Sequence, residues 1–297
     1  MNNLHDPATI KSILSRHGFT FSKRLGQNFL INPTVCPRIA EMGNAREGYG
    51  VIEIGPGIGV LTNELCLRAD KVVAIELDSR LIPILSETLA EHSNVKVINA
   101  DVLDIDLRNL IAEEFKGLRV AICANLPYYI TSPIVMKLLE DRLPVDTITT
   151  MVQREAAERL CAPLGSREAG AVTVAVDFYS EAKRLFNVSR GSFMPAPQVD
   201  SAVIQLKIRE HTPDVADEAL YFRIVRGIFT QRRKTLSNAV SGSMGIDKPI
   251  AAKIIEEAKI DPSARPEALK MPELIALCSA FNDIINRGEN VDAARAD

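Results

Sequence analysis

Short runs of apolar, often β-branched residues alternate with segments of helical spacing over the first two thirds of the chain. Such runs predict buried strands, and strands that alternate with helices predict a parallel sheet with helices on both faces. The predicted strands are residues 51–54, 71–75, 95–98, 120–124, 147–152, 172–178 and 202–208, and the segments of helical spacing between the early ones include residues 61–68, 79–91 and 133–140. The fold class is therefore α/β.

The end of this pattern differs from its beginning. Only residues 180–199 separate the last two predicted strands, which leaves little room for a helical crossover. We therefore expect an antiparallel pair that closes one edge of the sheet. After about residue 211 the spacing is helical, with breaks near residues 241–245 and 261–262. The sequence thus predicts two domains, a larger one over residues 1–210 and a small all-helical one over residues 211–297.

Charge is distributed unevenly along the chain. The net charge is −3, yet residues 221–240 contain five basic residues and no acidic one. A local basic patch of this kind binds nucleic-acid phosphates, and a solvated helix face is the alternative interpretation. We predict that Arg232, Arg233 and Lys234 contact backbone phosphates.

Cysteine and histidine usage predicts no metal site. The five cysteines and four histidines show neither a CxxC pair nor metal-ligand spacing, so buried thiols are expected in place of zinc or disulfides. No stretch approaches the roughly 18 uncharged apolar residues of a membrane span, and the N-terminus lacks the apolar core of a signal peptide. We therefore expect a cytoplasmic protein with no membrane partner.

A glycine-rich turn follows the first predicted strand. The segment Gly55-Pro-Gly57-Ile-Gly59 leads from that strand into a helix, where glycines let the backbone approach a ligand closely. The spacing is GxGxG, with Val60 where the dinucleotide fingerprint has its last glycine. This spacing disfavours an NAD-dependent oxidoreductase and favours a nucleoside cofactor without a pyrophosphate.

Acidic residues occur at the ends of the next two strands. Glu76 lies about twenty residues beyond the glycine turn, where a carboxylate can accept both hydroxyls of a ribose. Asp101 ends the third strand and could accept a hydrogen bond from an adenine amine, although Asp is also a common turn residue. Because ligands bind at the carboxyl ends of parallel strands, the glycine turn, Glu76 and Asp101 together predict a nucleoside site.

The fourth strand ends in Asn125-Leu126-Pro127-Tyr128. The Asn125 side-chain carbonyl and the Leu126 main-chain carbonyl can accept both hydrogens of an exocyclic amine, which favours a pyramidal nitrogen with a directed lone pair. Pro127 stiffens the turn, and Tyr128 can stack on a base that has left its helix. An ordinary structural turn is the alternative interpretation.

These segments together resemble the ribosomal RNA adenine N6,N6-dimethyltransferases, most closely the bacterial small-subunit (KsgA-like) type. The similarity covers nearly the whole chain and is highly specific. It begins at residues 23–30 (KRLGQNFL) and continues through residues 53–62, 74–78, 99–104, 125–131, 151–160 and 193–203. The resemblance implies a Rossmann-like seven-stranded methyltransferase sheet with a C-terminal all-helical RNA-recognition domain.

The resemblance also implies roles for single residues. S-adenosyl-L-methionine would be the cofactor, with Asn28 and Leu30 at its methionine end, Gly55 contacting it through the backbone, Glu76 at the ribose, Asp101 at the adenine and Asn125 beside both cofactor and substrate. The target adenine would be held by Asn125, Leu126, Tyr128 and Phe193. Without the resemblance, Phe193 would be interpreted as a core aromatic in a proline-rich loop.

The implied substrate is a pair of adjacent adenosines in a hairpin near the 3′ end of small-subunit (16S) rRNA, in a partly assembled 30S particle, modified by a monomeric enzyme. Large-subunit methyltransferases of the antibiotic-resistance type share the catalytic core but generally lack the segments found here at residues 193–201 and 229–236. They remain one alternative. A largely non-catalytic ribosome assembly factor is another.

Overall fold

The structure, a computed structural model, describes residues 4–22 and 27–287. These residues form two compact units. The first comprises the chain up to residue 157 together with residues 180–208, and the second comprises residues 158–179 together with the chain from residue 209. The first four residues of the 23–30 motif lie outside the described residues.

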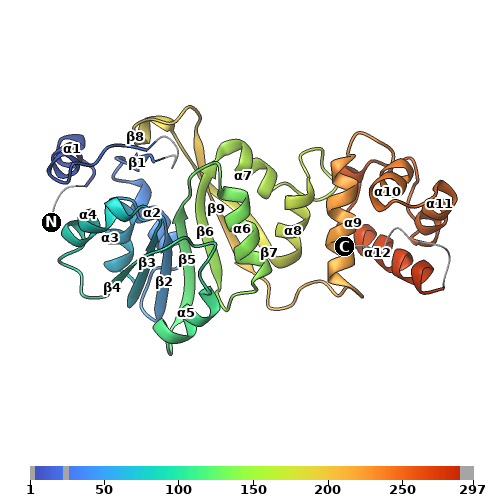
Figure 1. The fold of residues 1–297 in the computed structure, drawn as a ribbon, viewed down its shortest axis with the longest axis horizontal. Coiled ribbons are helices and arrows are strands. Elements are labelled where there is room, and N and C mark those ends of the chain that lie inside the picture. The colour runs from blue at the N-terminus through green and yellow to red at the C-terminus, as the bar shows by residue number, and fades with distance from the viewer. Residues whose placement is uncertain (1–3, 23–26, 288–297) are drawn as a thin grey trace. The chain divides into compact units, whose positions relative to one another are not determined.

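A seven-stranded sheet forms the centre of the first unit (Figure 1). Its strand order is β4-β3-β2-β5-β6-β9-β7, and the five strands from β4 to β6 are parallel. β9 runs antiparallel to both β6 and β7, so antiparallel strands close this edge as expected, although the outer strand is β7 and not the predicted residues 172–178. The strands are β2 (Tyr49–Ile54), β3 (Lys71–Glu76), β4 (Val95–Asn99), β5 (Arg119–Asn125), β6 (Thr147–Gln153), β7 (Ser180–Val188) and β9 (Ser201–Ile208).

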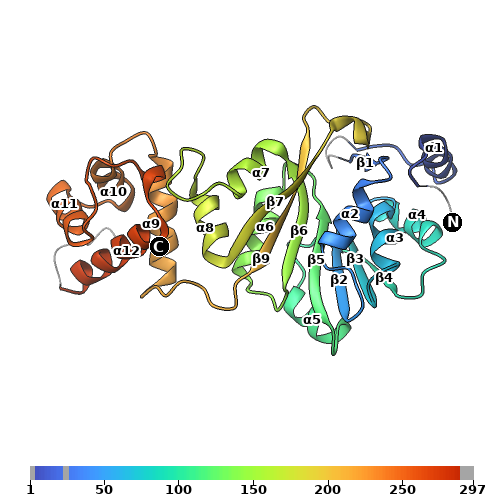
Figure 2. The same cartoon turned by 180° about the vertical axis from the view of Figure 1, so that it is seen from behind.

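Helices cover both faces of this sheet, as the alternating pattern predicted. α5 and α6 lie on the face seen in Figure 1, and α2 lies on the face seen in Figure 2. The helices of the first unit are α1 (Pro7–Arg16), α2 (Val35–Met42), α3 (Val60–Cys66), η2 (Ser79–Leu81), α4 (Ile82–Thr88), α5 (Leu107–Glu114), α6 (Thr131–Glu140) and η3 (Arg190–Ser192); α7 (Arg154–Leu160) spans the boundary with the second unit.

A second, very small sheet joins two distant segments of the chain. β1 (Phe29–Leu30) pairs antiparallel with β8 (Phe193–Met194), with Leu30 opposite Phe193. The amide of Ile31 also donates to the carbonyl of Ser192 at 2.9 Å. This pairing places the segment before α2 beside the loop that leads into β9.

One predicted strand is wrong. Residues 172–178 form part of α8 (Ala171–Tyr179), and the strand follows directly as β7. A short apolar β-branched run fits a buried helix as well as a buried strand, and most of α8 is buried. The actual strand was missed because its exposed positions include Glu181, Lys183 and Arg184, which hide the apolar signal.

α8 belongs to the second unit because it packs on the first long helix there. The ring of Phe178 lies 5.3 Å from that of Tyr221, and Tyr179 stacks on Phe222 at 5.5 Å. The Tyr179 hydroxyl donates to Glu218 at 2.7 Å. Residues 158–179, which the sequence placed in the first domain, therefore group with the helical unit.

The rest of the second unit is helical, as its spacing indicated. The break expected near residues 261–262 falls between α11 and η4, whereas of residues 241–245 only Gly245 lies outside a helix, because residues 241–244 form the last turn of α10. The helices are α8, α9 (Glu218–Thr230), α10 (Leu236–Met244), α11 (Lys248–Glu257), η4 (Pro266–Ala268) and α12 (Met271–Asn286). Within the described ranges, none of the helices combines the length and apolarity that crossing a bilayer requires.

Close packing between β2 and α5 depends on a missing side chain. A Cβ built on Gly50 would lie 2.0 Å from Cδ1 of Phe115, which is itself buried. The Phe115 ring therefore occupies the space above β2 that any larger residue would need. The nearest atoms belong to a rigid aromatic ring and not to the end of a flexible side chain, so an added Cβ could not be accommodated by a small side-chain movement.

We expect Gly50→Ala to lower the free energy of unfolding by about 1–3 kcal/mol, because overpacking a core forces side chains and backbone to shift. Gly170→Ala is the matched control, since a Cβ there meets nothing within 4 Å. Urea unfolding of the two variants measures the difference. Equal stability of both would show that the Phe115 ring moves aside freely.

Candidate active site

The loop after β2 takes a conformation that favours glycine. Gly55, Gly57 and Gly59 have φ values of 72°, 60° and 88°, and Gly59 caps α3 in the left-handed region. A Cβ on Gly57 would also lie 3.2 Å from the ring of Phe29 in β1. The loop therefore presents bare backbone to the space beside it.

Glu76 binds this loop from the neighbouring strand. It stands at the end of β3, where Oε2 accepts from the Gly57 amide at 3.2 Å and Oε1 accepts from the Asp78 amide at 2.8 Å. Its side chain is buried, and burial raises its pKa to about 7. The carboxyl group thus lies at the predicted position and is held by two amides.

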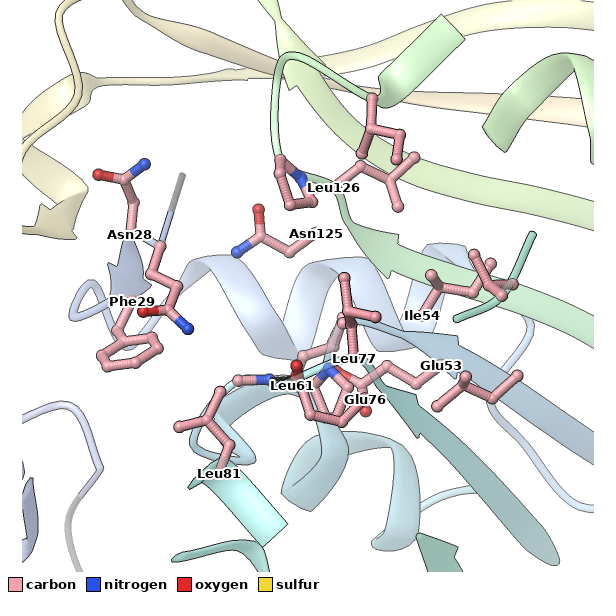
Figure 3. Close-up of a pocket in the computed structure, with 18 of the residues that line it drawn as sticks. Asn28, Phe29, Glu53, Ile54, Leu61, Glu76, Leu77, Leu81, Asn125 and Leu126 are labelled. Atoms are coloured by element: carbon pink, nitrogen blue, oxygen red, sulfur yellow. Dashed lines mark hydrogen bonds between the residues drawn. The ribbon is translucent and has the colours of Figure 1, made fainter. Parts of the chain in front are cut away.

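Glu53 is a second buried carboxyl group that the sequence analysis missed. It lies within β2, is 1% exposed, and points toward the same space as Glu76 (Figure 3). Burial raises its pKa to about 8, and the nearby Glu76 adds to the shift. Oε2 has no hydrogen-bond partner among the described residues. A lone glutamate inside an otherwise apolar strand was the signal that could have identified it.

Asp101 combines a turn role with a place in the pocket. Its Oδ1 accepts from the Leu103 amide at 2.9 Å, so it forms the turn that its residue type predicts. It also lines the same cavity as Glu76. The two interpretations of this residue are therefore compatible.

The turn after β5 is held rigidly. The Pro127 carbonyl accepts from the Ile130 amide and from the Thr131 hydroxyl, each at 3.2 Å. The Tyr128 hydroxyl lies 2.7 Å from the Ser201 hydroxyl at the start of β9. Asn125 extends from its strand end into the cavity, opposite Asn28 (Figure 3). The turn therefore fixes where Asn125 and the main chain of Leu126 lie.

The β1–β8 pairing completes the wall of the cavity. It sets Leu30 opposite Phe193, whose side chain is only 4% exposed and belongs to the hydrophobic core as well as to the cavity wall. Next to β1, the Gln27 amide donates to Asp78 at 2.7 Å. The expectation of a core aromatic at Phe193 and the expectation of a pocket residue thus describe the same side chain.

All nine residues predicted for cofactor or base line one open cleft of about 1120 Å³. They are Asn28, Leu30, Gly55, Glu76, Asp101, Asn125, Leu126, Tyr128 and Phe193. From β2 the chain continues to β3 and β4 on one side of the sheet and then to β5 and β6 on the other. The cleft lies at the carboxyl ends of the strands at this change of direction, which is the usual ligand site of such sheets.

The three predicted phosphate-binding residues belong to the second unit and are not among the residues that line the cleft. Arg232, Arg233 and Lys234 follow α9 and are all exposed. Arg232 donates to the Arg167 carbonyl at 2.9 Å. The described residues contain no group of three or more His, Cys, Asp or Glu side chains that could hold a metal ion.

Comparison with known proteins identifies the family. The model of the family described as ribosomal RNA adenine dimethylase matches residues 18–277. The chain belongs to this family. It is 44% identical over 284 residues to ribosomal RNA small subunit methyltransferase A of Geobacillus sp. (strain WCH70), covering 94% of this chain and 98% of that protein. It is 46% identical over 287 residues to the protein of that name from Shouchella clausii (strain KSM-K16), covering 95% and 97%.

Solved structures agree with this assignment and with the predicted Rossmann-like fold. A dimethyladenosine transferase from Plasmodium falciparum superposes with a TM-score of 0.72 at 26% identity, covering 86% of this chain and 98% of that one. The 23S rRNA methyltransferase ErmE superposes with a TM-score of 0.67 at 28% identity, covering 86% and 100%. The resemblance seen in the sequence is therefore confirmed at the level of family and fold.

The two buried carboxyl groups predict how stability depends on pH. Both folded pKa values lie above the ordinary value of 4.5, so the folded state holds protons that the unfolded state has lost. The free energy of unfolding should therefore fall by roughly 1 kcal/mol per pH unit for each group, from about pH 5 to about pH 7 for Glu76 and from about pH 5 to about pH 8 for Glu53. Thermal unfolding in a pH series measures this slope.

Glu53→Gln should reduce that slope, because a neutral amide resembles the protonated acid. Its stability relative to the unsubstituted protein should be greater at pH 8.5 than at pH 5. Glu113→Gln, on an exposed helix position, is the matched control and should leave the slope unchanged. An identical slope in Glu53→Gln and the unsubstituted protein would contradict the pKa assigned to Glu53.

Proposed function

We propose that this protein transfers methyl groups from S-adenosyl-L-methionine to N6 of two adjacent adenosines near the 3′ end of small-subunit (16S) rRNA, giving N6,N6-dimethyladenosine. One observation carries the proposal. A single cleft brings the acids and glycines suited to a nucleoside cofactor together with an Asn-Leu-Pro-Tyr turn suited to an aromatic amine. Family membership assigns the reaction class.

The residues at the cofactor side fit S-adenosyl-L-methionine. The bare backbone of the glycine loop accepts a close ligand, Glu76 offers carboxylate oxygens for ribose hydroxyls, and Asp101 offers an acceptor for an adenine amine. Oε2 of Glu53, which has no hydrogen-bond partner among the described residues, offers a polar atom to a bound cofactor. Asn28 and Leu30 would hold the methionine end. When bound, the cofactor supplies an electrophilic methyl group on a sulfonium.

The residues of the turn after β5 would activate the amine by position. The lone pair of adenine N6 is delocalised into the ring, so the nitrogen is a poor nucleophile. The Asn125 side-chain carbonyl and the Leu126 main-chain carbonyl accept its two hydrogens and direct the lone pair toward the methyl group. Tyr128 and Phe193 hold the ring between them. No strong base is needed, because the alkylated nitrogen loses its proton readily, and orientation supplies most of the rate.

The choice of small-subunit RNA follows from the relatives. Proteins named ribosomal RNA small subunit methyltransferase A share 44–47% identity with nearly the whole chain, whereas the large-subunit enzyme ErmE shares 28%. The segments at residues 193–201 and 229–236 also resemble those of the small-subunit type. The substrate particle would be a partly assembled 30S subunit, and the enzyme would act as a monomer.

The decisive experiment is mass spectrometry of rRNA after incubation with the purified protein and a methyl-labelled cofactor. Unmethylated 30S and 50S particles are offered in separate reactions. We expect N6,N6-dimethyladenosine at two adjacent positions in 16S rRNA. Preferential labelling of 23S rRNA would establish the resistance-type function, and binding without any labelling would establish a non-catalytic assembly factor.

We expect Asn125→Ala to lower kcat by about 100-fold or more, because it removes an acceptor that is needed in the transition state. The Kd values for RNA and cofactor should change far less. Asn109→Ala, an exposed helical asparagine, is the matched control and should retain full activity. Full activity in Asn125→Ala would contradict the proposed hydrogen bond between the Asn125 side chain and the adenine amine.

We propose that Arg232, Arg233 and Lys234 bind RNA phosphates. Replacing all three with Ala should weaken RNA binding and reduce the slope of log K against log salt by about 0.7–0.9 for each lost contact. Filter binding between 50 and about 300 mM salt measures the slope. Lys248→Ala, an exposed lysine of the same unit, is the control. An unchanged slope in the triple variant would leave these charges as a solvated face.

A further inference from the structure

Tyr129 stands out among the residues that line the cleft. It is 58% exposed, the highest value of any large hydrophobic side chain in the described part of the protein. Its neighbour Tyr128 is anchored through its hydroxyl to Ser201 and is only partly exposed. Two consecutive tyrosines of one turn therefore have different surroundings, one held inside the cleft and one open at its rim.

The turn presents Tyr129 from a fixed backbone. Hydrogen bonds to the Pro127 carbonyl close the turn on the far side of Tyr129, and the Tyr128 hydroxyl fixes it on the near side. Within residues 4–22 and 27–287, no hydrogen bond and no ring contact engages Tyr129 itself. An aromatic ring that is held by its backbone and uncovered on its faces loses little entropy when a flat ligand stacks on it.

The reaction leaves a flat group unstacked at this place. Methylation of N6 takes one purine out of its stack and into the cleft, so the adjacent nucleotide loses a stacking partner. That nucleotide must remain at the rim, because it is joined to the inserted one by a single phosphodiester. Tyr129 follows directly after the tyrosine that holds the inserted base.

We propose that the ring of Tyr129 is a stacking platform for the base next to the adenosine that is being methylated. The proposal rests on the proposed function, because it needs an RNA base inserted at Asn125 and Tyr128. It gives the turn two tasks, since one tyrosine holds the target and the next holds its neighbour. With two adjacent adenosines as substrate, the second adenosine occupies the platform while the first reacts.

The cofactor is a weaker candidate for this ring. Among the described residues, the other strongly exposed apolar side chain of the cleft wall is Leu77, at 48%, which directly follows Glu76 in the chain. Tyr129 belongs instead to the turn that carries Asn125 and Leu126. Stacking on a base requires the π face of an aromatic ring, which Tyr129 has and Leu77 lacks.

A double-mutant cycle tests the platform. The substrates are a 16S-derived hairpin with two adjacent adenosines and the two hairpins in which one or the other adenosine is replaced by an abasic residue. The enzymes are the unsubstituted protein, Tyr129→Phe and Tyr129→Leu. Single-turnover methylation of the remaining adenosine gives kcat/KM for each combination, and calorimetry gives the Kd for the cofactor.

In the unsubstituted protein, loss of the neighbouring base should lower kcat/KM by about 5- to 100-fold in at least one of the abasic hairpins. Tyr129→Phe should behave in the same way. Tyr129→Leu should lose a similar factor on the intact hairpin and then be insensitive to the abasic change, so that the two effects are not additive. The Kd for the cofactor should stay within twofold in all three proteins.

Equal sensitivity of Tyr129→Leu and the unsubstituted protein to the missing base would overturn the platform. A Kd for the cofactor that rises in Tyr129→Leu as much as kcat/KM falls would also overturn it, by placing the ring against the cofactor. If the unsubstituted protein methylates no hairpin and no 30S particle, the proposed function itself fails, and the platform falls with it.

A spectroscopic readout is independent of turnover. The chain contains no tryptophan, so Tyr129→Trp introduces a single indole. Its fluorescence should be quenched by the intact hairpin and much less by the hairpin that lacks the neighbouring base. Leu67→Trp, 57% exposed at the end of α3 and outside the cleft wall, is the matched control and should not respond. Equal quenching at both positions would contradict the stacking.

Discussion

Parallel pairing of β2 with β3 on one side and with β5 on the other brings three strand ends to one edge of the sheet. The glycine loop, Glu76 and Asn125 follow from that register, because each stands at or directly after the carboxyl end of its strand. A shift of one residue in either pairing would turn these side chains to the opposite face. Because the strands are buried and apolar, their register is strongly determined. The packing of the core therefore fixes the positions of the site residues.

The predictable part of the fold is the part with strong local signals. The parallel strands could be identified because they are short, β-branched and buried on both faces. The helix α8 and the strand β7 were not distinguished, since the apolar run belongs to the helix and the strand carries charges on its exposed positions. The helix α5 was not among the helices named from the sequence, although it has an ordinary start signal in Asp106, whose side chain accepts from the Asn109 amide at 3.0 Å.

The site divides in the same way. Residues at strand ends could be placed from the sequence, because the topology of an α/β sheet fixes where those ends meet. The contact between Leu30 and Phe193 could not, because β1 and β8 are two residues long and lie far apart in the chain. The local sequence predicts neither that Glu53 is buried nor that the side chain of Tyr129 is exposed to solvent. Both depend on which neighbours the tertiary structure supplies.

β7 ends the sheet with a row of backbone groups that a strand from another molecule could extend. Three features oppose that addition. Lys183 and Arg184 project from the strand, and the register shifts between Arg184 and Phe186, which twists the ladder. The guanidinium of Arg38 also lies 3.8 Å from the centre of the Phe186 ring and covers it. Charge and irregular register at this edge therefore disfavour pairing with a strand of another molecule.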